Sequence, residues 1–472
     1  GVDGILNWQA PQGNWTILRF GHTATGQQNH SAPTLGTGLD CDKFSRSALE
    51  FHFEKMFSRI MPILENAAKT GKVGLLIDSY EMGLQNWTGE LPKAFKKRNG
   101  YAIVPFLPAL VGRTVGDPLL TEQFLWDFRR TLADLMAENY YGHFKRLCEK
   151  HNLITYTEPY GHGPFEEMQI GEKIDINMGE FWAGITNLWP NSSLSKTVKI
   201  AASISRIKGE SIIGAESFTA EPGSGKWQQY PFSMKSLGDR MFTKGVTRYY
   251  FHRYAHQPHP TAMPGMTMGP WGIHFERTNT WWKPGREWLK YITRCQYLLR
   301  QGRFVATLLY FTGEEVPIAM LDPEFCSYKP PHGYDYDLVN GKGLKGLYKD
   351  GGCFSLPGGT GYKVMILAEF EIASLEVLLD LKSLVERGLI LVGPRPKRLP
   401  GISSMAQLTD FKTLIQSIWG DLDFTDEAKP HQLGIGRVYT CHDLSKVLSL
   451  ENILPDLLKM KIARMRKRMD MR

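Results

Sequence analysis

Residues 75–88 read LLIDSYEMGLQNWT and place a short apolar run directly before a polar, aromatic segment. Residues 73–77 are apolar without helical spacing, which is typical of a buried parallel strand. In a parallel α/β barrel, functional residues lie where strands end and loops begin. A carboxylate beside aromatic and amide side chains is a common lining of a sugar site, and the alternative is that Asp78 caps the next helix. The polar residues in question are Asp78, Tyr80, Glu81, Asn86 and Trp87.

Three further strand-like runs end just before a glutamate. They are residues 153–157, 174–178 and 212–215, and the glutamates that follow are Glu158, Glu180 and Glu216. Stretches with helical spacing of apolar residues, at 45–68, 121–150 and 195–207, separate the runs. Residues 15–20 (WTILRF) are expected to form one more strand before the first of these helices. Because alternating strands and helices build a parallel sheet, the pattern predicts an α/β barrel with acidic strand ends.

The chain changes character after residue 303. Runs at 304–311, 362–367 and 388–392 are typical of strands, and residues 374–386 of a helix. They predict a smaller, doubly wound α/β domain. Gly341, Gly343 and Gly346 match GxGxxG, but no buried strand is evident before them and no clear helix after them. We therefore interpret these glycines as a surface loop and expect no nucleotide cofactor.

Composition and charge exclude several classes of protein. The formal net charge is +8, but the last 14 residues, KMKIARMRKRMDMR, contain seven Lys/Arg and one Asp and carry +6 of it, which leaves +2 for the rest. Nucleic-acid binding is therefore disfavoured. The six cysteines form no CxxC pair, so neither a zinc site nor a disulfide framework is indicated. No apolar run is long enough to span a membrane, and Gly1 is not followed by a signal peptide.

A segment rich in histidine and tryptophan follows a strand-like run at residues 246–251. It extends to residue 282 and includes His252, Trp271, His274 and Arg277 among many Pro and Gly residues. It contains no HExxH motif, so hydrogen bonding to a polar ligand is favoured over a transition-metal site. The alternative for His274 and Arg277 is that they are structural partners of the helix that follows.

Several long motifs, taken together, resemble glycoside hydrolase family 106, the α-L-rhamnosidases. They are WQAPQGNWTILRFGHTATG at 8–26, GLDCDK at 38–43, DSYEMGLQNWT at 78–88, GEFW at 179–182, AESFTA at 215–220, and PGMTMGPWGIHFERTNTWW at 264–282. The motif GYDYDLVN at 333–340 resembles the start of the next domain in that family. The resemblance extends to about residue 400.

The resemblance implies a (β/α)8-type barrel without its first strands, since family members are longer. We expect this barrel at residues 1–302, a flavodoxin-like accessory domain at 303–458 and a basic tail at 459–472. It also implies an inverting mechanism, with Glu81 as general acid and Glu216 as general base. Calcium is the expected cofactor, with Glu180 and Glu158 as ligands. By the same resemblance, the expected location is the periplasm or the exterior of a bacterium.

The expected partner is a rhamnose-containing oligosaccharide or glycoside. An inverting pair of carboxyl groups should lie roughly 6.5–9.5 Å apart, with room for a water molecule. Two other functions stay open from the sequence: a non-catalytic sugar-binding or scaffold module, and another exo-glycosidase such as a β-galactosidase. The residues expected to contact the sugar are Asp40, Asp42, Lys43, Asp78, Tyr80, Asn86, Trp87, Glu158, Trp182, His252, Trp271, His274 and Arg277.

Overall fold

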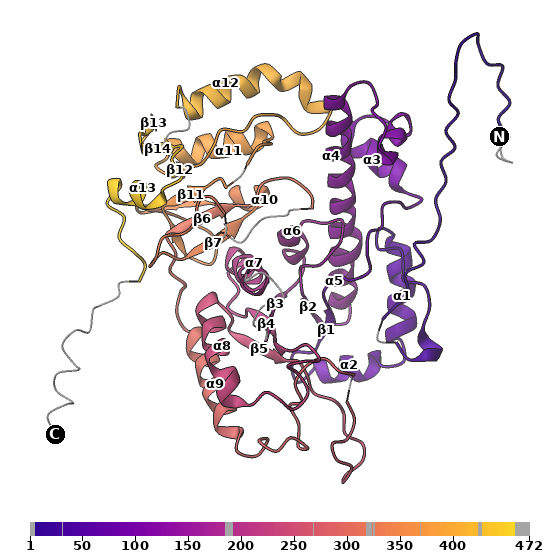
Figure 1. Cartoon of the computed structure of the whole chain (residues 1–472), viewed down its shortest axis with the longest axis vertical. Coiled ribbons are helices and arrows are strands. Elements are labelled where there is room, and N and C mark those ends of the chain that lie inside the picture. Colours follow the sequence, from indigo (N-terminus) through magenta and orange to yellow (C-terminus); the bar gives the residue numbers. More distant parts are fainter. Residues whose placement is uncertain are drawn as a thin grey trace.

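The computed structural model describes residues 5–457, apart from 31, 185–191, 268, 318–322, 324–325, 369 and 423–426. The expected basic tail lies outside these residues. Two sheets dominate the molecule, and helices cover them (Figure 1). None of the helices in the described ranges combines the length and the hydropathy that a membrane span requires.

The first sheet consists of five parallel strands in the order in which they occur along the chain. They are β1 (Gly74–Ile77), β2 (Ile154–Thr157), β3 (Ile176–Trp182), β4 (Gly214–Thr219) and β5 (Arg248–Phe251). Helices α1 (Arg46–Phe57) and α2 (Met61–Ala68) precede β1, and α9 (Arg286–Leu299) follows β5. The helices between the strands are α3 (Leu91–Asn99), α4 (Pro118–Leu135), α5 (Gly142–Glu149), α6 (Glu167–Gly171), α7 (Ser192–Lys208) and α8 (Pro231–Lys244). This half-barrel confirms the predicted fold class.

The predicted strand at residues 15–20 is wrong as a sheet element. These residues are exposed and belong to neither sheet. In Figure 1 they lie on the extended arm near the N-terminus. A strand needs a neighbour to satisfy its backbone groups, and β1 pairs only with β2 among the described strands. The apolar pattern of residues 15–20 alone was therefore not enough to predict a strand.

The second sheet has the strand order β13-β14-β12-β11-β6-β7, and all its pairs are parallel except β13 with β14. Its strands are β6 (Leu308–Phe311), β7 (Tyr336–Val339), β11 (Val364–Ile366), β12 (Ile390–Val392), β13 (His431–Leu433) and β14 (Gly436–Tyr439). Helices α11 (Leu375–Glu386) and α12 (Leu408–Trp419) pack on one face, while α13 (Leu444–Leu450) and α7 pack on the other. Both faces are thus covered, as predicted for a doubly wound sheet. A hairpin-like sheet of β8 (Tyr348–Asp350), β9 (Cys353–Ser355) and β10 (Gly361–Tyr362) lies beside it.

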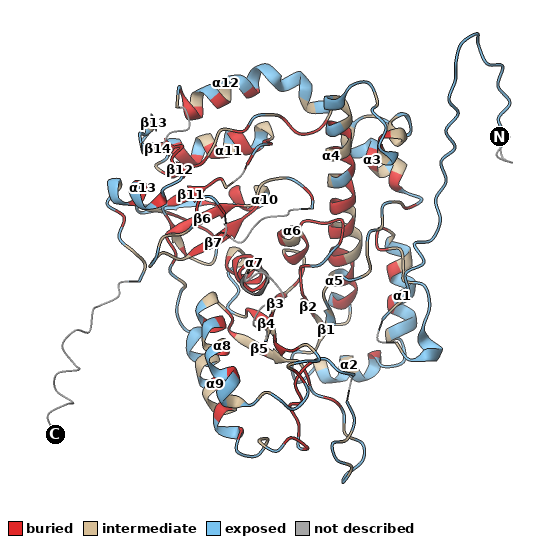
Figure 2. Ribbon diagram, viewed as in Figure 1, coloured by how far each residue is buried: buried red, intermediate tan, exposed pale blue. Residues whose placement is uncertain are grey.

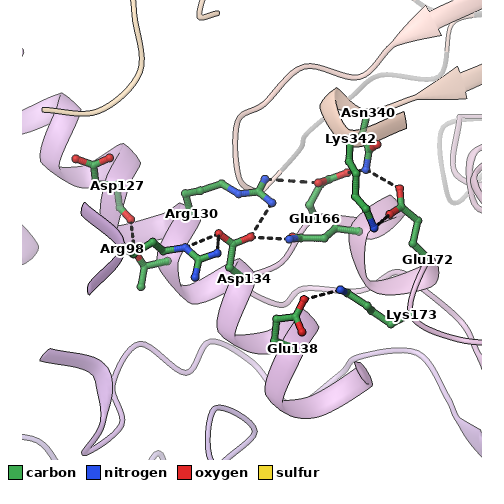
Figure 3. A network of polar contacts seen from close by, with 12 residues as sticks. Arg98, Asp127, Arg130, Asp134, Glu138, Glu166, Glu172, Lys173, Asn340 and Lys342 are labelled. Carbon is green, nitrogen blue, oxygen red and sulfur yellow. Dashed lines mark hydrogen bonds and ion pairs between the residues drawn. The ribbon is translucent and has the colours of Figure 1, made fainter. Parts of the chain in front are cut away.

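The expectation of a surface loop at residues 341–346 is wrong. Strand β7 is buried along its whole length, and Gly341–Leu344 forms the short helix α10 directly after it. Asn340 caps this helix by accepting a hydrogen bond from the Gly343 N–H at 2.8 Å. The turn faces α6, because the Asn340 amide donates to Glu166 at 2.9 Å and Lys342 pairs with Glu172 at 2.8 Å (Figure 3).

Helix α7 connects the two sheets, because it packs on β3 and also on β7. Residues 197–206 of this helix are all buried, and most of α7 has the colour of buried residues in Figure 2. Arg206 of α7 pairs with Asp337 of β7 at 2.5 Å, and the Asp337 side chain is only 1% exposed. Ser203 and Tyr362 also donate to Asp337, at 3.1 and 2.8 Å. This carboxylate therefore fixes the half-barrel against the second sheet.

We predict that Asp337→Ala lowers the free energy of unfolding by about 3–5 kcal/mol, because it leaves Arg206 buried without its partner. Chemical denaturation followed by tryptophan fluorescence measures this loss. Glu386→Ala is the matched control, since it breaks the solvent-exposed pair with Lys382 on α11 and should cost at most about 1 kcal/mol. Equal losses in the two variants would contradict a role for Asp337 in joining the sheets.

Candidate active site

Acidic side chains gather at the carboxyl end of the half-barrel. Asp78, Glu158 and Glu216 each offer a carboxylate oxygen, and these oxygens lie within 4.8 Å of one another. The strand register explains the gathering. Glu180 pairs with Glu216 across β3 and β4, while Asp78 and Glu158 directly follow the paired residues Ile77 and Thr157. The sequence placed Glu180 and Glu216 beyond their strands, whereas both lie within strands that extend further than predicted.

Glu81 is near enough to the site to raise the pKa of two of its carboxyl groups. Burial raises the pKa of Glu216 to about 7, the Thr219 hydroxyl opposes this by donating to the carboxylate, and Asp78, Glu180 and Glu81 raise the pKa further. Burial likewise raises the pKa of Glu180, a hydrogen bond from Trp182 opposes the shift, and Glu81 and Asp78 add to it. Glu81 therefore acts on both β3 and β4 carboxylates, as expected of residues that face one site.

Glu158 is the most deeply buried acid of the group, at 1% exposure. Burial raises its pKa well above the usual value, and the charges of Glu216 and Asp78 raise it further. Tyr160 donates to its Oε2 at 2.5 Å, whereas Oε1 has no donor within the described structure. A hydrogen bond between Glu158 and Asp78 forms only when the two carboxyl groups share a proton. When both are ionised, the buried Oε1 has no partner and is available to a ligand.

Glu81 itself is exposed on the loop after β1. Ser79 donates to its Oε1 at 2.7 Å, and the preceding Tyr80 is buried at 4% exposure. The backbone of Tyr80 is bonded on both sides to the loop after β2. The Glu81 carboxylate is thus open to solvent, while hydrogen bonds to the loop after β2 fix the backbone of the preceding residue.

A cavity of about 470 Å³ lies beside this loop. Five residues predicted to contact the sugar line it, namely Asp40, Asp42, Lys43, Tyr80 and Trp87. His22 also lines the cavity and stacks on Trp87, with ring centroids 6.2 Å apart and planes 27° apart. Stacked rings of this kind suit the apolar face of a sugar. Asn86 is exposed and does not line the cavity.

The charged groups of this cavity are largely paired with one another. Lys43 forms an ion pair with Asp40, and burial lowers the pKa of Lys43 to about 8. Asp42 accepts hydrogen bonds from Thr88 at 2.6 Å and from Phe44 N–H at 2.9 Å, and also one from Gln85. Asp42 therefore organises the loop, while Asp40 and Lys43 keep a polar surface toward the cavity.

The histidine-rich segment divides between the site and the scaffold. Trp271 packs edge-on against Trp182 at 5.9 Å, and Trp182 bonds Glu180. Burial lowers the pKa of His252, and the nearby charge of Asp78 opposes this shift. Trp182, Trp271 and His252 thus border the carboxylates.

The contacts of His274 and Arg277 are with neighbouring loops, whereas the alternative interpretation made them partners of the helix that follows. His274 is 2% exposed and packs on Trp227, with ring centroids 4.4 Å apart. Arg277 donates to the backbone carbonyls of Pro260, Gln257 and His259 at 2.8–3.3 Å. Arg277 is therefore bonded to the backbone of its own segment, whereas the buried Nε2 of His274 has no hydrogen-bond partner within the described residues, and the sugar contact stays a prediction for both.

A metal ion would find oxygen ligands here. Within the described residues, the group that could hold an ion consists of carboxylates alone, Asp78, Glu158 and Glu216. Hard cations such as calcium prefer oxygen ligands, and the free Oε1 of Glu158 is available to one. Glu180, the other expected ligand, is not a member of this group. The donor chemistry thus fits calcium, and the cofactor stays a prediction.

Sequence reasoning missed three residues that contact predicted ones. Tyr160 and Thr219 bind Glu158 and Glu216, and His22 stacks on Trp87. A signal was present for the first two, because hydroxyl residues stand two and three positions after the acids in EPY and ESFT. No local signal connects His22 with Trp87, which are far apart in the sequence.

Comparison with known proteins gives consistent matches. A sequence model of glycoside hydrolase family 106, described as alpha-L-rhamnosidase, matches residues 1–469. A curated relative from Formosa agariphila, named "Putative beta-glucuronidase", is 42% identical over 419 residues. That match covers 88% of this chain and 35% of the relative, so the chain spans about a third of the relative's length.

Two solved structures are similar to the chain. A rhamnosidase from Novosphingobium sp. PP1Y matches with a TM-score of 0.80 and 30% identity, over 91% of this chain and 41% of that one. A β-galactosidase from Bacillus circulans sp. alkalophilus matches with a TM-score of 0.52 and 11% identity, over 89% of this chain and 75% of that one. The second likeness shows the fold alone.

The raised pKa of Glu216 predicts a pH-dependent loss of stability. Because the folded state binds the proton more tightly than the unfolded one, stability is highest below the ordinary value of 4.5 and falls as pH rises through about 7. Glu216→Gln should remove this loss, so that at pH 8 the variant exceeds the wild type by about 3 kcal/mol. Unfolding measured between pH 4 and 8 checks this, with exposed Glu54→Gln as control. A gain that does not vary with pH would contradict it.

Proposed function

This chain belongs to glycoside hydrolase family 106, and on that premise we propose that it releases terminal rhamnose from α-L-rhamnosides with inversion at the anomeric carbon. The observation that supports the proposal is that Glu216 of β4 lies in the acidic group at the carboxyl end of the half-barrel, while Glu81, on the loop after β1, is near enough to raise its pKa. Glycoside hydrolysis requires two such carboxyl groups, one on each side of the scissile bond. The proposed location is the periplasm or the exterior of a bacterium.

The proposed role of each acid is the one that the resemblance to the family implies. Glu81, on an accessible loop, protonates the leaving oxygen as general acid. Glu216 takes a proton from the attacking water as general base, and a pKa of about 7 suits a base that operates near neutral pH. Thr219 donates to Glu216 and so keeps its carboxylate in one orientation. Water then attacks the anomeric carbon as the bond to the aglycone breaks, which inverts the configuration.

The neighbouring cavity supplies a place for the sugar ring or for the aglycone. Trp87 and His22 offer an aromatic face, and Asp40 and Lys43 offer hydrogen-bonding groups. The relative named as a β-glucuronidase makes a glucuronide the competing substrate. A uronate would need a cation in the cavity, and Lys43, which is already paired with Asp40, is the candidate.

We expect the chain to hydrolyse 4-nitrophenyl α-L-rhamnopyranoside in preference to the β-D-glucuronide and the β-D-galactoside. Glu81→Gln and Glu216→Gln should each lower kcat by about 10²-fold or more, because each removes a proton transfer. Release of nitrophenol measures the rates, and NMR of the first sugar product shows its configuration. Glu54→Gln, at an exposed position on α1, is the control. Preference for the glucuronide would replace the proposed substrate, and no turnover of any glycoside would favour a sugar-binding module.

We also propose calcium as cofactor, held by Glu158 with Asp78 beside it, and with Glu180 as the second ligand that the family resemblance implies. Calcium takes six to eight oxygen ligands, and when bound it would orient vicinal hydroxyls of the sugar. The support for it is electrostatic, since like charges crowd a buried site unless a cation neutralises them.

Removal of calcium should abolish hydrolysis of the rhamnoside. We expect exhaustive treatment with EDTA to eliminate the rate, and added calcium chloride to restore it. Magnesium should restore less, because it prefers a small octahedral site. A rate that is unchanged after complete chelation would remove calcium from the mechanism and leave Glu158 and Glu180 to bond the sugar directly.

A further inference from the structure

Tyr160 is a buried residue in contact with a carboxylate of the site, and it was not part of the predicted site. It lies two residues after Glu158 in the loop that follows β2, and it is 6% exposed. Its hydroxyl donates to Glu158 Oε2 at 2.5 Å, and its backbone N–H donates to the carbonyl of Glu158 at 2.8 Å. The side chain also lies within the field of Glu180 and Glu216. Tyr160 is thus a buried residue that contacts one acid of the group and lies near two others.

The backbone around Tyr160 holds the loop that carries Glu81. The Tyr80 N–H donates to the carbonyl of Tyr160 at 2.9 Å, and the His162 N–H donates to the carbonyl of Tyr80 at 3.1 Å. Gly161 lies between these two bonds. A Cβ atom there would lie 2.1 Å from the Tyr80 oxygen, and the φ of +133° is one that residues with side chains rarely adopt. The parallel pairing of β1 and β2 therefore continues past the strands as far as Glu81's neighbour.

The two oxygens of Glu158 have different surroundings. Oε2 is fixed by Tyr160, while Oε1 is buried and receives no hydrogen bond from the described residues. An unpaired buried acceptor is costly, so such an atom generally has a partner in the working state of a protein. The tyrosine hydroxyl decides which oxygen is held and which is left for a ligand.

We propose that Tyr160 is a positioning residue of the glycosidase site. It fixes the Glu158 carboxylate so that Oε1 faces the substrate, and its backbone sets the position of Glu158 relative to the loop of Glu81. The identity of the bound sugar rests on the proposed function, but the orientation of Glu158 does not. The ligand class is a polyol with a hydroxyl at Oε1, either bonded directly or through a bound cation.

The matched pair of variants is Tyr160→Phe and Tyr141→Phe. Both remove one hydroxyl from a buried tyrosine, but the Tyr141 hydroxyl has no partner within the described structure. We expect Tyr160→Phe to raise KM for the aryl α-L-rhamnoside by about tenfold, and to raise the Kd for L-rhamnose, measured by calorimetry, by the same factor. The reason is that a Glu158 carboxylate free to turn loses its contact with the sugar in the ground state. Tyr141→Phe should change both by less than about twofold. Loss of folded protein would lower the apparent kcat and leave KM unchanged.

Crystal structures of both variants provide a readout that needs no turnover. The carboxylate of Glu158 should turn in Tyr160→Phe and keep its orientation in Tyr141→Phe. Should the wild type hydrolyse no rhamnoside, the proposed substrate fails, and the orientation of Glu158 alone decides the role of Tyr160. An unmoved carboxylate in Tyr160→Phe, or an unchanged KM and Kd in an active enzyme, would overturn the inference. A turned carboxylate with raised KM or Kd supports it.

Discussion

The parallel register of β1 to β5 is the constraint on which the site depends. Side chains alternate between the two faces of a strand, so the pairing of Glu180 with Glu216 brings both carboxylates to one face. A slip of one residue in β3 or β4 would move its acid to the face covered by helices. Asp78 and Glu158 obey the same rule, one residue beyond the last paired positions of β1 and β2. The chemistry of the site is therefore a property of the whole sheet.

Bringing these acids together opposes folding. Each carboxylate loses water on burial and repels its neighbours, which is why the pKa values of Glu158, Glu180 and Glu216 are all raised. The cost is offset elsewhere, in the apolar contacts of the two sheets and in the buried contacts of α7 with β7. A protonated acid, a positive ion or a hydrogen-bonding ligand each relieves the repulsion, and a general acid and base need that sensitivity to protonation.

Features that depend on a few consecutive residues could be predicted from the sequence. The apolar runs before Asp78 and Glu158 are short and end abruptly, so both strands and both acids were located correctly. Features that depend on distant partners could not. Residues 15–20 have a strand pattern but no neighbour to pair with, and the helix at Gly341 depends on Asn340, whose amide is fixed by glutamates of α6.

The same distinction applies to the side chains in and around the site. Arg277 and His274 look like ligand-binding residues because of their chemical type, yet their partners are a loop backbone and Trp227. Tyr160 resembles an ordinary core residue, yet its hydroxyl contacts the most buried acid of the site. Residue type indicates what a side chain is able to bond, whereas packing decides what lies within reach. In a site at the end of a parallel sheet, the hydrogen-bond partners of the acids therefore have to be identified from the structure, atom by atom.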